Sequence, residues 1–207
     1  NGKYIIYNEG LGYSAPFEIN EDAFRQGLLT FMSGMYHQRS GVALTLPYTR
    51  FTRGVGHPND GEVLDHALLV EDGYEVQFTS ALEGEQIDVT MGHYDAGDYG
   101  KYTIQGARVI WDLLTALDNN PAELAHDNLG IPESGNGIPD IMDELIHEIK
   151  WVKNMQDPND GGVFIMVKPE MGFQVGSLPD ADVKRYIWPK GTSTTGGFAY
   201  AMARAAR

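Results

Sequence analysis

Apolar residues recur at three- to four-residue spacing in four stretches of the chain, a pattern typical of helices that bury one face. The spacing predicts helices over residues 21–37, from about 99 to 119, over 139–156 and over 192–207. Asn20 is the predicted N-cap of the first helix, because its side chain can accept a backbone hydrogen bond and two acidic residues follow it.

Between these helices the pattern is weaker. Residues 3–19 predict short strands separated by a turn, too few for a sheet with its own core. Residues 40–92 and 163–190 are broken by Gly, Pro and Asp and predict loops, with a short strand pair in the first region. Loops this long can gather at one end of a helical scaffold and build a binding cleft there. The last helical pattern is still running at Arg207, so we expect a fragment of a larger domain.

The composition narrows the possible partners. With 15 basic and 29 acidic residues among 207, the formal net charge is −14. Such an excess of acid argues against nucleic acid or an anionic membrane as a partner. The sequence has no apolar run near the ~20 residues of a membrane span. The absence of cysteine excludes disulfides and thiolate metal ligands but leaves the compartment open.

The segment of residues 92–102 is the most distinctive in the chain. It places two carboxylates, Asp95 and Asp98, three residues apart among glycines and tyrosines. A close pair of carboxylates can hold and deprotonate one water molecule. The rings of Tyr94 and Tyr99 offer flat apolar faces of the kind on which sugars pack. The alternative is structural: an aspartate that caps the helix behind the segment, with a first-turn charge beside it.

Two further groups are candidates. Tyr186 and Trp188 lie in a loop beside a proline and are candidates for sugar binding, although aromatic rings in such places often only pack. Glu133, Asn136 and Asp140 put oxygen ligands on a glycine-broken loop before a helix, which suits calcium. A solvated turn with an aspartate that satisfies the helix dipole is the favoured alternative for this loop.

Four motifs, in order along the chain, resemble glycoside hydrolase family 9, the inverting cellulases and their relatives. Residues 94–102 closely resemble the family's catalytic-base signature. The other three motifs are residues 36–41, residues 131–144, and residues 185–207. Residues 1–19 resemble the end of the immunoglobulin-like domain that precedes the catalytic domain in one branch, so the resemblance covers nearly the whole chain.

The resemblance implies a mainly α fold. Residues 20–207 would form the first part of an (α/α)6 barrel, and residues 1–19 the end of an immunoglobulin-like β-sandwich. It also implies hydrolysis with inversion, in which a base activates water while an acid protonates the leaving oxygen. By motif position Asp98 is the general base and Asp95 helps to hold the same water. The family's acid is a glutamate far towards the C-terminus, beyond Arg207.

On this basis we expect a secreted, periplasmic or cell-surface enzyme that hydrolyses β-1,4-glucosidic bonds in cellulose or related β-glucans. An exo-acting family member that cleaves glucosamine or chitin-type oligosaccharides is the alternative, since the same motif serves both. Without the acid, the isolated chain is expected to be inactive. It would then be a glucan-binding piece, and its natural partner would be the remainder of the catalytic domain.

Two departures from the family pattern matter. Many relatives of this branch bind zinc through cysteines and histidines in the region corresponding to residues 40–63. Here Ser40 stands at the first cysteine position and the sequence after His57 departs as well, so zinc is not expected. No cofactor is required beyond the possible structural calcium. The family's Gly-Gly-Trp or Gly-Gly-Tyr before the base motif is replaced by Met91, Gly92 and His93.

Overall fold

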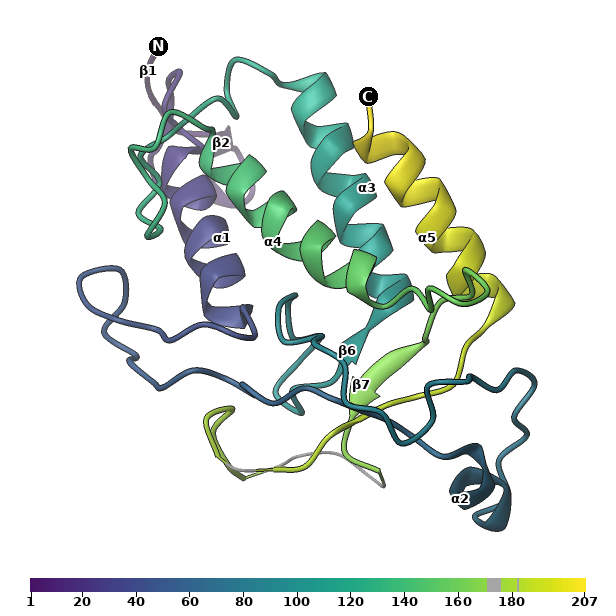
Figure 1. The fold of residues 1–207 in the computed structure, drawn as a ribbon. Coiled ribbons are helices and arrows are strands. Elements are labelled where there is room, and N and C mark those ends of the chain that lie inside the picture. The colour runs from purple at the N-terminus through teal and green to yellow at the C-terminus, as the bar shows by residue number, and fades with distance from the viewer. Residues whose placement is uncertain (171–175, 182) are drawn as a thin grey trace.

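The computed structural model describes residues 1–170, 176–181 and 183–207. Its main body consists of long helices packed side by side (Figure 1), which confirms a mainly helical fold. These are α1 (Arg25–Gln38), α3 (Thr103–Asn119), α4 (Asp140–Asn154) and α5 (Thr192–Ala205). Helix α3 packs against both α4 and α5, and α1 packs against α4.

The first helix begins later than the sequence predicts. Helix α1 starts at Arg25, and the residue at its N-cap position, Phe24, makes no side-chain capping hydrogen bond. The predicted cap at Asn20 is wrong, because its side-chain amide donates to Glu18 Oε2 at 3.3 Å. Between Asn20 and the start of α1 the chain forms a turn, which is closed by the hydrogen bond from the Arg25 N–H to the Asp22 carbonyl.

A four-stranded sheet lies at one end of the long helices (Figure 1). Its order is β5 (Glu62–Val63), β8 (Tyr186–Ile187), β7 (Met166–Lys168) and β6 (Lys101–Tyr102), with β5 and β8 parallel and the other pairs antiparallel. The loop assignment for residues 163–190 missed β7 and β8, and that for residues 40–92 missed the short helix α2 (His66–Glu71). Strand β5 lies in the region where a short strand pair was expected, and β6 lies in a stretch that was predicted to be helical. Strands of two or three residues whose partners lie far along the chain leave almost no local pattern.

The first nineteen residues form two small antiparallel pairs. Strand β1 (Gly2–Tyr4) pairs with β4 (Phe17–Ile19), and β2 (Tyr7–Asn8) pairs with β3 (Gly12–Tyr13). Nearly all of these residues are exposed. The short strands therefore exist as predicted, and they bury no core of their own.

Helix α4 supplies the centre of the hydrophobic core. Ile141, Leu145, Val152 and Met155 are all buried, as the predicted apolar stripe requires. The opposite side of α4 is also largely buried, including Glu144, His147, Glu148 and Trp151. Gly106 of α3 faces this side at close range: a Cβ there would lie 2.8 Å from Trp151 Cζ3 and would overlap Glu148 Oε1.

Gly106→Ala is therefore expected to destabilise the protein by about 1–3 kcal/mol, the usual cost of overpacking a filled core. Gly34→Ala in α1 is the matched control, because nothing lies within 4 Å of its added methyl group. That variant should gain up to ~1 kcal/mol from helix propensity alone. Urea unfolding of both variants gives the two signs, and a stabilising Gly106→Ala would contradict the close approach of α3 and α4.

Candidate active site

The segment with the two aspartates folds into a tight turn directly before strand β6. The Asp95 N–H donates to the Gly100 carbonyl at 2.8 Å, and the Tyr99 N–H donates to the Ala96 carbonyl at 3.1 Å. Asp95 is exposed and Asp98 is half-buried. Neither caps the following helix, since no side chain makes a capping bond at the start of α3. The capping alternative is thus wrong, and both carboxylates face accessible space.

The turn provides one backbone donor to the Asp98 carboxylate, from the Gly100 N–H to Oδ1 at 3.3 Å. Charged and polar groups lie around the same carboxylate. Burial lowers the pKa of Lys168, and the Asp98 charge opposes that shift. Burial raises the pKa of Tyr102, and the charges of Asp98 and Asp95 raise it further. Asp98 therefore shares one electrostatic environment with a lysine and a phenol.

Tyr99 takes the strained conformation in this turn. Its φ is +57°, in the left-handed region that non-glycine residues rarely adopt. Gly97, which lies between the two aspartates, has no positive φ. The Tyr99 carbonyl accepts a 2.6 Å hydrogen bond from Arg185 Nη1, which fixes this conformation from outside the turn.

A buried charged network lies directly behind the turn. Arg185 is fully buried and donates from Nη2 to the Val167 carbonyl at 3.0 Å. Its Nε lies 3.2 Å from Asp60 Oδ1, and Lys101 Nζ lies 2.9 Å from Asp60 Oδ2. Burial lowers the pKa of Lys101 to about 8, against the opposing effect of Asp60. Two buried cations thus share one buried carboxylate behind the candidate base.

The four predicted sugar-binding rings divide into two pairs. Tyr94 and Trp188 are each only 4% exposed, so neither offers an open face and their assignment as platforms is wrong. The Tyr94 hydroxyl instead lies 2.7 Å from His57 Nδ1, and Lys168 Nζ lies 4.2 Å from the centre of the Trp188 ring. Tyr99 and Tyr186 are half-buried and keep part of their surface accessible.

A second buried cluster, missed by the sequence analysis, joins the turn to α4. His93 Nδ1 lies 2.7 Å from Glu148 Oε2, and His93 Nε2 lies 2.8 Å from Glu144 Oε2. Arg39 Nε donates to the same Glu144 oxygen at 3.0 Å, and Arg39 Nη1 pairs with Glu133. The sequence feature that could have indicated this cluster is the pair Glu144 and Glu148, which lie one helical turn apart beside the apolar stripe of α4.

The two histidines near α4 carry different charges. Burial alone would lower the pKa of His93, but the hydrogen bonds to Glu144 and Glu148 outweigh it and raise that pKa to about 9. Burial lowers the pKa of His147 to about 2, and the neighbouring His93 cation adds to the effect. His93 is therefore a cation at neutral pH, and neutral His147 donates from Nε2 to the Gly92 carbonyl at 3.1 Å.

Each of the three predicted calcium ligands has a bonding partner within the protein. Glu133 pairs with Arg39, the Asn136 Oδ1 accepts from the Ile138 N–H, and Asp140 Oδ2 accepts from the Leu129 N–H at 2.6 Å. These bonds organise the loop as a hydrogen-bonded turn. Calcium at this loop stays a prediction without geometric support.

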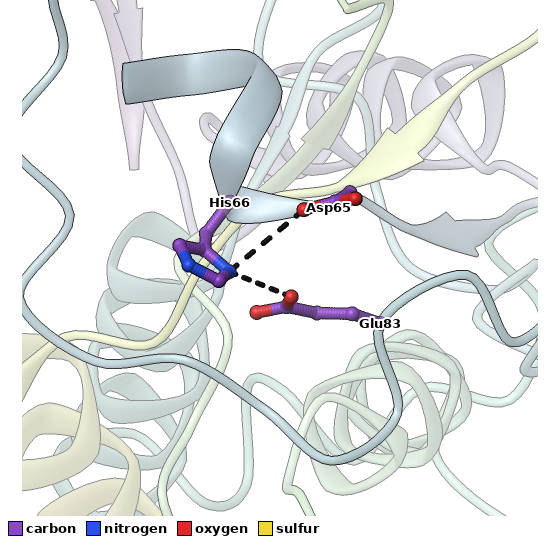
Figure 2. A group of neighbouring side chains, drawn as sticks. All are labelled: Asp65, His66 and Glu83. Atoms are coloured by element: carbon purple, nitrogen blue, oxygen red, sulfur yellow. Dashed lines mark hydrogen bonds and ion pairs between the residues drawn. The ribbon is translucent and has the colours of Figure 1, made fainter. Parts of the chain in front are cut away.

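Within the described residues, one group of His and acidic side chains has metal-ligand spacing, formed by Asp65, His66 and Glu83 (Figure 2). His66 Nδ1 lies 2.7 Å from Glu83 Oε2 and 3.8 Å from Asp65 Oδ1. Asp65 Oδ1 also accepts from the Ala67 N–H and so caps α2. The bond to Glu83 raises the pKa of His66. An ion pair and a helix cap account for this group, and the expectation of no zinc stays a prediction.

Comparisons with known proteins agree on one family. Residues 24–207 match the family described as Glycosyl hydrolase family 9. The chain is 32% identical to a cellulose 1,4-beta-cellobiosidase of Acetivibrio thermocellus, with 99% of this chain and 25% of that protein covered. It is 30% identical to endoglucanase D of the same organism, with 100% and 31% covered.

The structural comparison gives the same result. The fold matches a crystal structure of a metagenome-derived glycoside hydrolase family 9 endoglucanase with a TM-score of 0.80 and 33% sequence identity. That alignment covers 100% of this chain and 35% of the other. The chain therefore spans about a quarter to a third of the length of these relatives. In its described residues, no helix combines the length and apolar character needed to cross a bilayer.

Proposed function

The chain belongs to glycosyl hydrolase family 9, and from this premise we propose that it carries the base-bearing part of a catalytic domain that hydrolyses β-1,4-glucans with inversion. The observation that carries the proposal is the turn of residues 95–100. It presents Asp95 and Asp98 together at accessible surface, and neither is used as a helix cap. The names of the relatives, a cellobiosidase and an endoglucanase, support a β-1,4-glucan as substrate.

In the proposed mechanism Asp98 takes a proton from water as that water attacks the anomeric carbon. Asp95, on the same turn, accepts the second hydrogen of the water and orients it. Because the Gly100 N–H bonds to Asp98 Oδ1, the other oxygen of the Asp98 carboxylate is left to take the proton from water. A general acid on the opposite side of the sugar, about 6.5–9.5 Å away in inverting enzymes, protonates the leaving oxygen. We propose that residues outside this chain supply that acid.

The same premise extends to the architecture. We propose that α1, α3, α4 and α5 belong to an (α/α)6 barrel and that residues 1–19 end an immunoglobulin-like domain. The family match that starts at residue 24 and the exposed side chains of β1 to β4 support that boundary. We also propose action outside the cytoplasm, because a polymeric glucan cannot cross a membrane to reach an internal enzyme.

The test is a substrate panel applied to the polypeptide that joins this chain to the rest of its catalytic domain. Soluble β-1,4-glucans and mixed-linkage glucans should release reducing ends, and proton NMR should show the α-anomer first. Release from chitosan oligomers alone would replace the glucanase by the glucosaminidase alternative, and a β-anomer formed first would exclude inversion. The isolated 207-residue chain should be inactive on every substrate of the panel.

A further inference from the structure

His93 lies two residues before Asp95, at the position where the sequence departs from the family's Gly-Gly-Trp pattern. We infer that His93 is a positioning residue, which clamps the base-bearing turn onto helix α4 and thereby sets the orientation of the Asp98 carboxylate. The inference rests on the proposed function of Asp98. It concerns residues that the family resemblance did not assign.

His93 is bonded to helix α4 at several of its atoms. The His93 backbone N–H donates to Glu148 Oε2 at 2.9 Å, and the Nδ1 of the same residue lies 2.7 Å from the same oxygen. The Nε2 bonds to Glu144 at 2.8 Å. Three contacts thus fasten His93 to two glutamates one turn apart on α4, and its side chain is only 8% exposed.

Charge also holds His93 against α4. Carboxylates accept hydrogen bonds and cannot donate them when ionised, so both ring nitrogens must carry protons. The imidazolium lies between two glutamates that are at most 1% exposed. A move of His93 away from α4 would leave the buried Glu148 carboxylate without this cation, which is unfavourable, so the clamp resists such a move. Arg39 Nε also bonds to Glu144 Oε2, the oxygen that His93 Nε2 contacts.

The clamp lies at one end of the turn that carries Asp95 and Asp98. The hydrogen bonds from Asp95 to Gly100 and from Tyr99 to Ala96 close the turn on itself. Its placement relative to the rest of the site therefore depends on its two ends. Arg185 fixes one end through the Tyr99 carbonyl, and His93 fixes the other. A displacement of about 1 Å in a catalytic group can cost 10²-fold in rate.

The experiment uses the polypeptide that joins this chain to the rest of its domain. The double variant His93→Phe/Glu148→Gln removes the clamp and leaves no unpaired charge at position 148. We expect kcat to fall at least about tenfold with KM within about twofold, and a crystal structure should show Asp98 displaced by about 1 Å. Glu148→Gln alone keeps an acceptor for His93 and should retain kcat within about threefold.

A matched control separates positioning from stability. Lys190 Nζ and Asp157 Oδ2 form another buried pair, 3.0 Å apart. Lys190→Met/Asp157→Asn should lower stability and leave kcat unchanged. If the clamp variant does not fold, His93→Gln, which keeps one of the two ring contacts, is tested in the same way.

The results separate this inference from the proposed function. A wild-type kcat in the clamp variants, or an Asp98 that stays in place, overturns the clamp while the base assignment stands. An inactive wild-type enzyme counts against the proposed function instead. The crystallographic position of Asp98 then still decides whether His93 positions the turn.

Discussion

Replacing Asp98 with alanine is expected to lower the turnover of the enzyme that contains this chain by about 10²–10⁴-fold, the usual contribution of a general base. Without the Asp98 carboxylate the group that takes the proton of the attacking water is lost, and Asp95 remains only to orient that water. Asp98 bonds only weakly to the turn, through the 3.3 Å contact from the Gly100 N–H, so the fold should survive the change. KM should change much less than kcat, because the lost interaction acts in the transition state.

Two comparison variants show whether the lower turnover of Asp98→Ala comes from the missing base. Asp98→Asn keeps an oxygen for the Gly100 N–H but cannot accept a proton, so it should be nearly as slow as Asp98→Ala. Asp112→Ala, which removes an exposed aspartate paired with Arg108 on α3, should be fully active. Initial rates on a soluble β-1,4-glucan at several concentrations give kcat and KM. Near-normal turnover in Asp98→Ala would end the base assignment and the function built on it.

The helices and the base-bearing turn were the predictable parts of this protein. Periodicity located α3, α4 and α5 because each buries a continuous apolar face that recurs along the chain. The turn was recognised because Asp95, Asp98 and their glycines and tyrosines are close in sequence.

The contacts that hold the turn were not predictable from local patterns. Arg185 meets Asp60 and the Tyr99 carbonyl across 125 and 86 positions, and sequence spacing carries no information over such separations. The aromatic assignments failed for a related reason. Tyr94 and Trp188 look like loop residues in the sequence. The four-stranded sheet of β5, β8, β7 and β6 makes the surrounding segments a buried layer.

Arg185→Met is the second change with a large expected effect, a loss of about 3–5 kcal/mol in the free energy of unfolding. The arginine is fully buried, and its removal leaves Asp60 with Lys101 as its single remaining ion-pair partner among the residues described. The Val167 and Tyr99 carbonyls lose their donors at the same time. Methionine fills most of the volume, so the loss reports charge and hydrogen bonding rather than a cavity.

The adjacent residue provides the control. Lys184 forms an exposed ion pair with Glu62, so Lys184→Met should leave stability nearly unchanged. Urea unfolding of the two methionine variants compares a buried and an exposed cation one position apart. Equal stability of the two single variants would show that the network behind the turn contributes nothing to holding it.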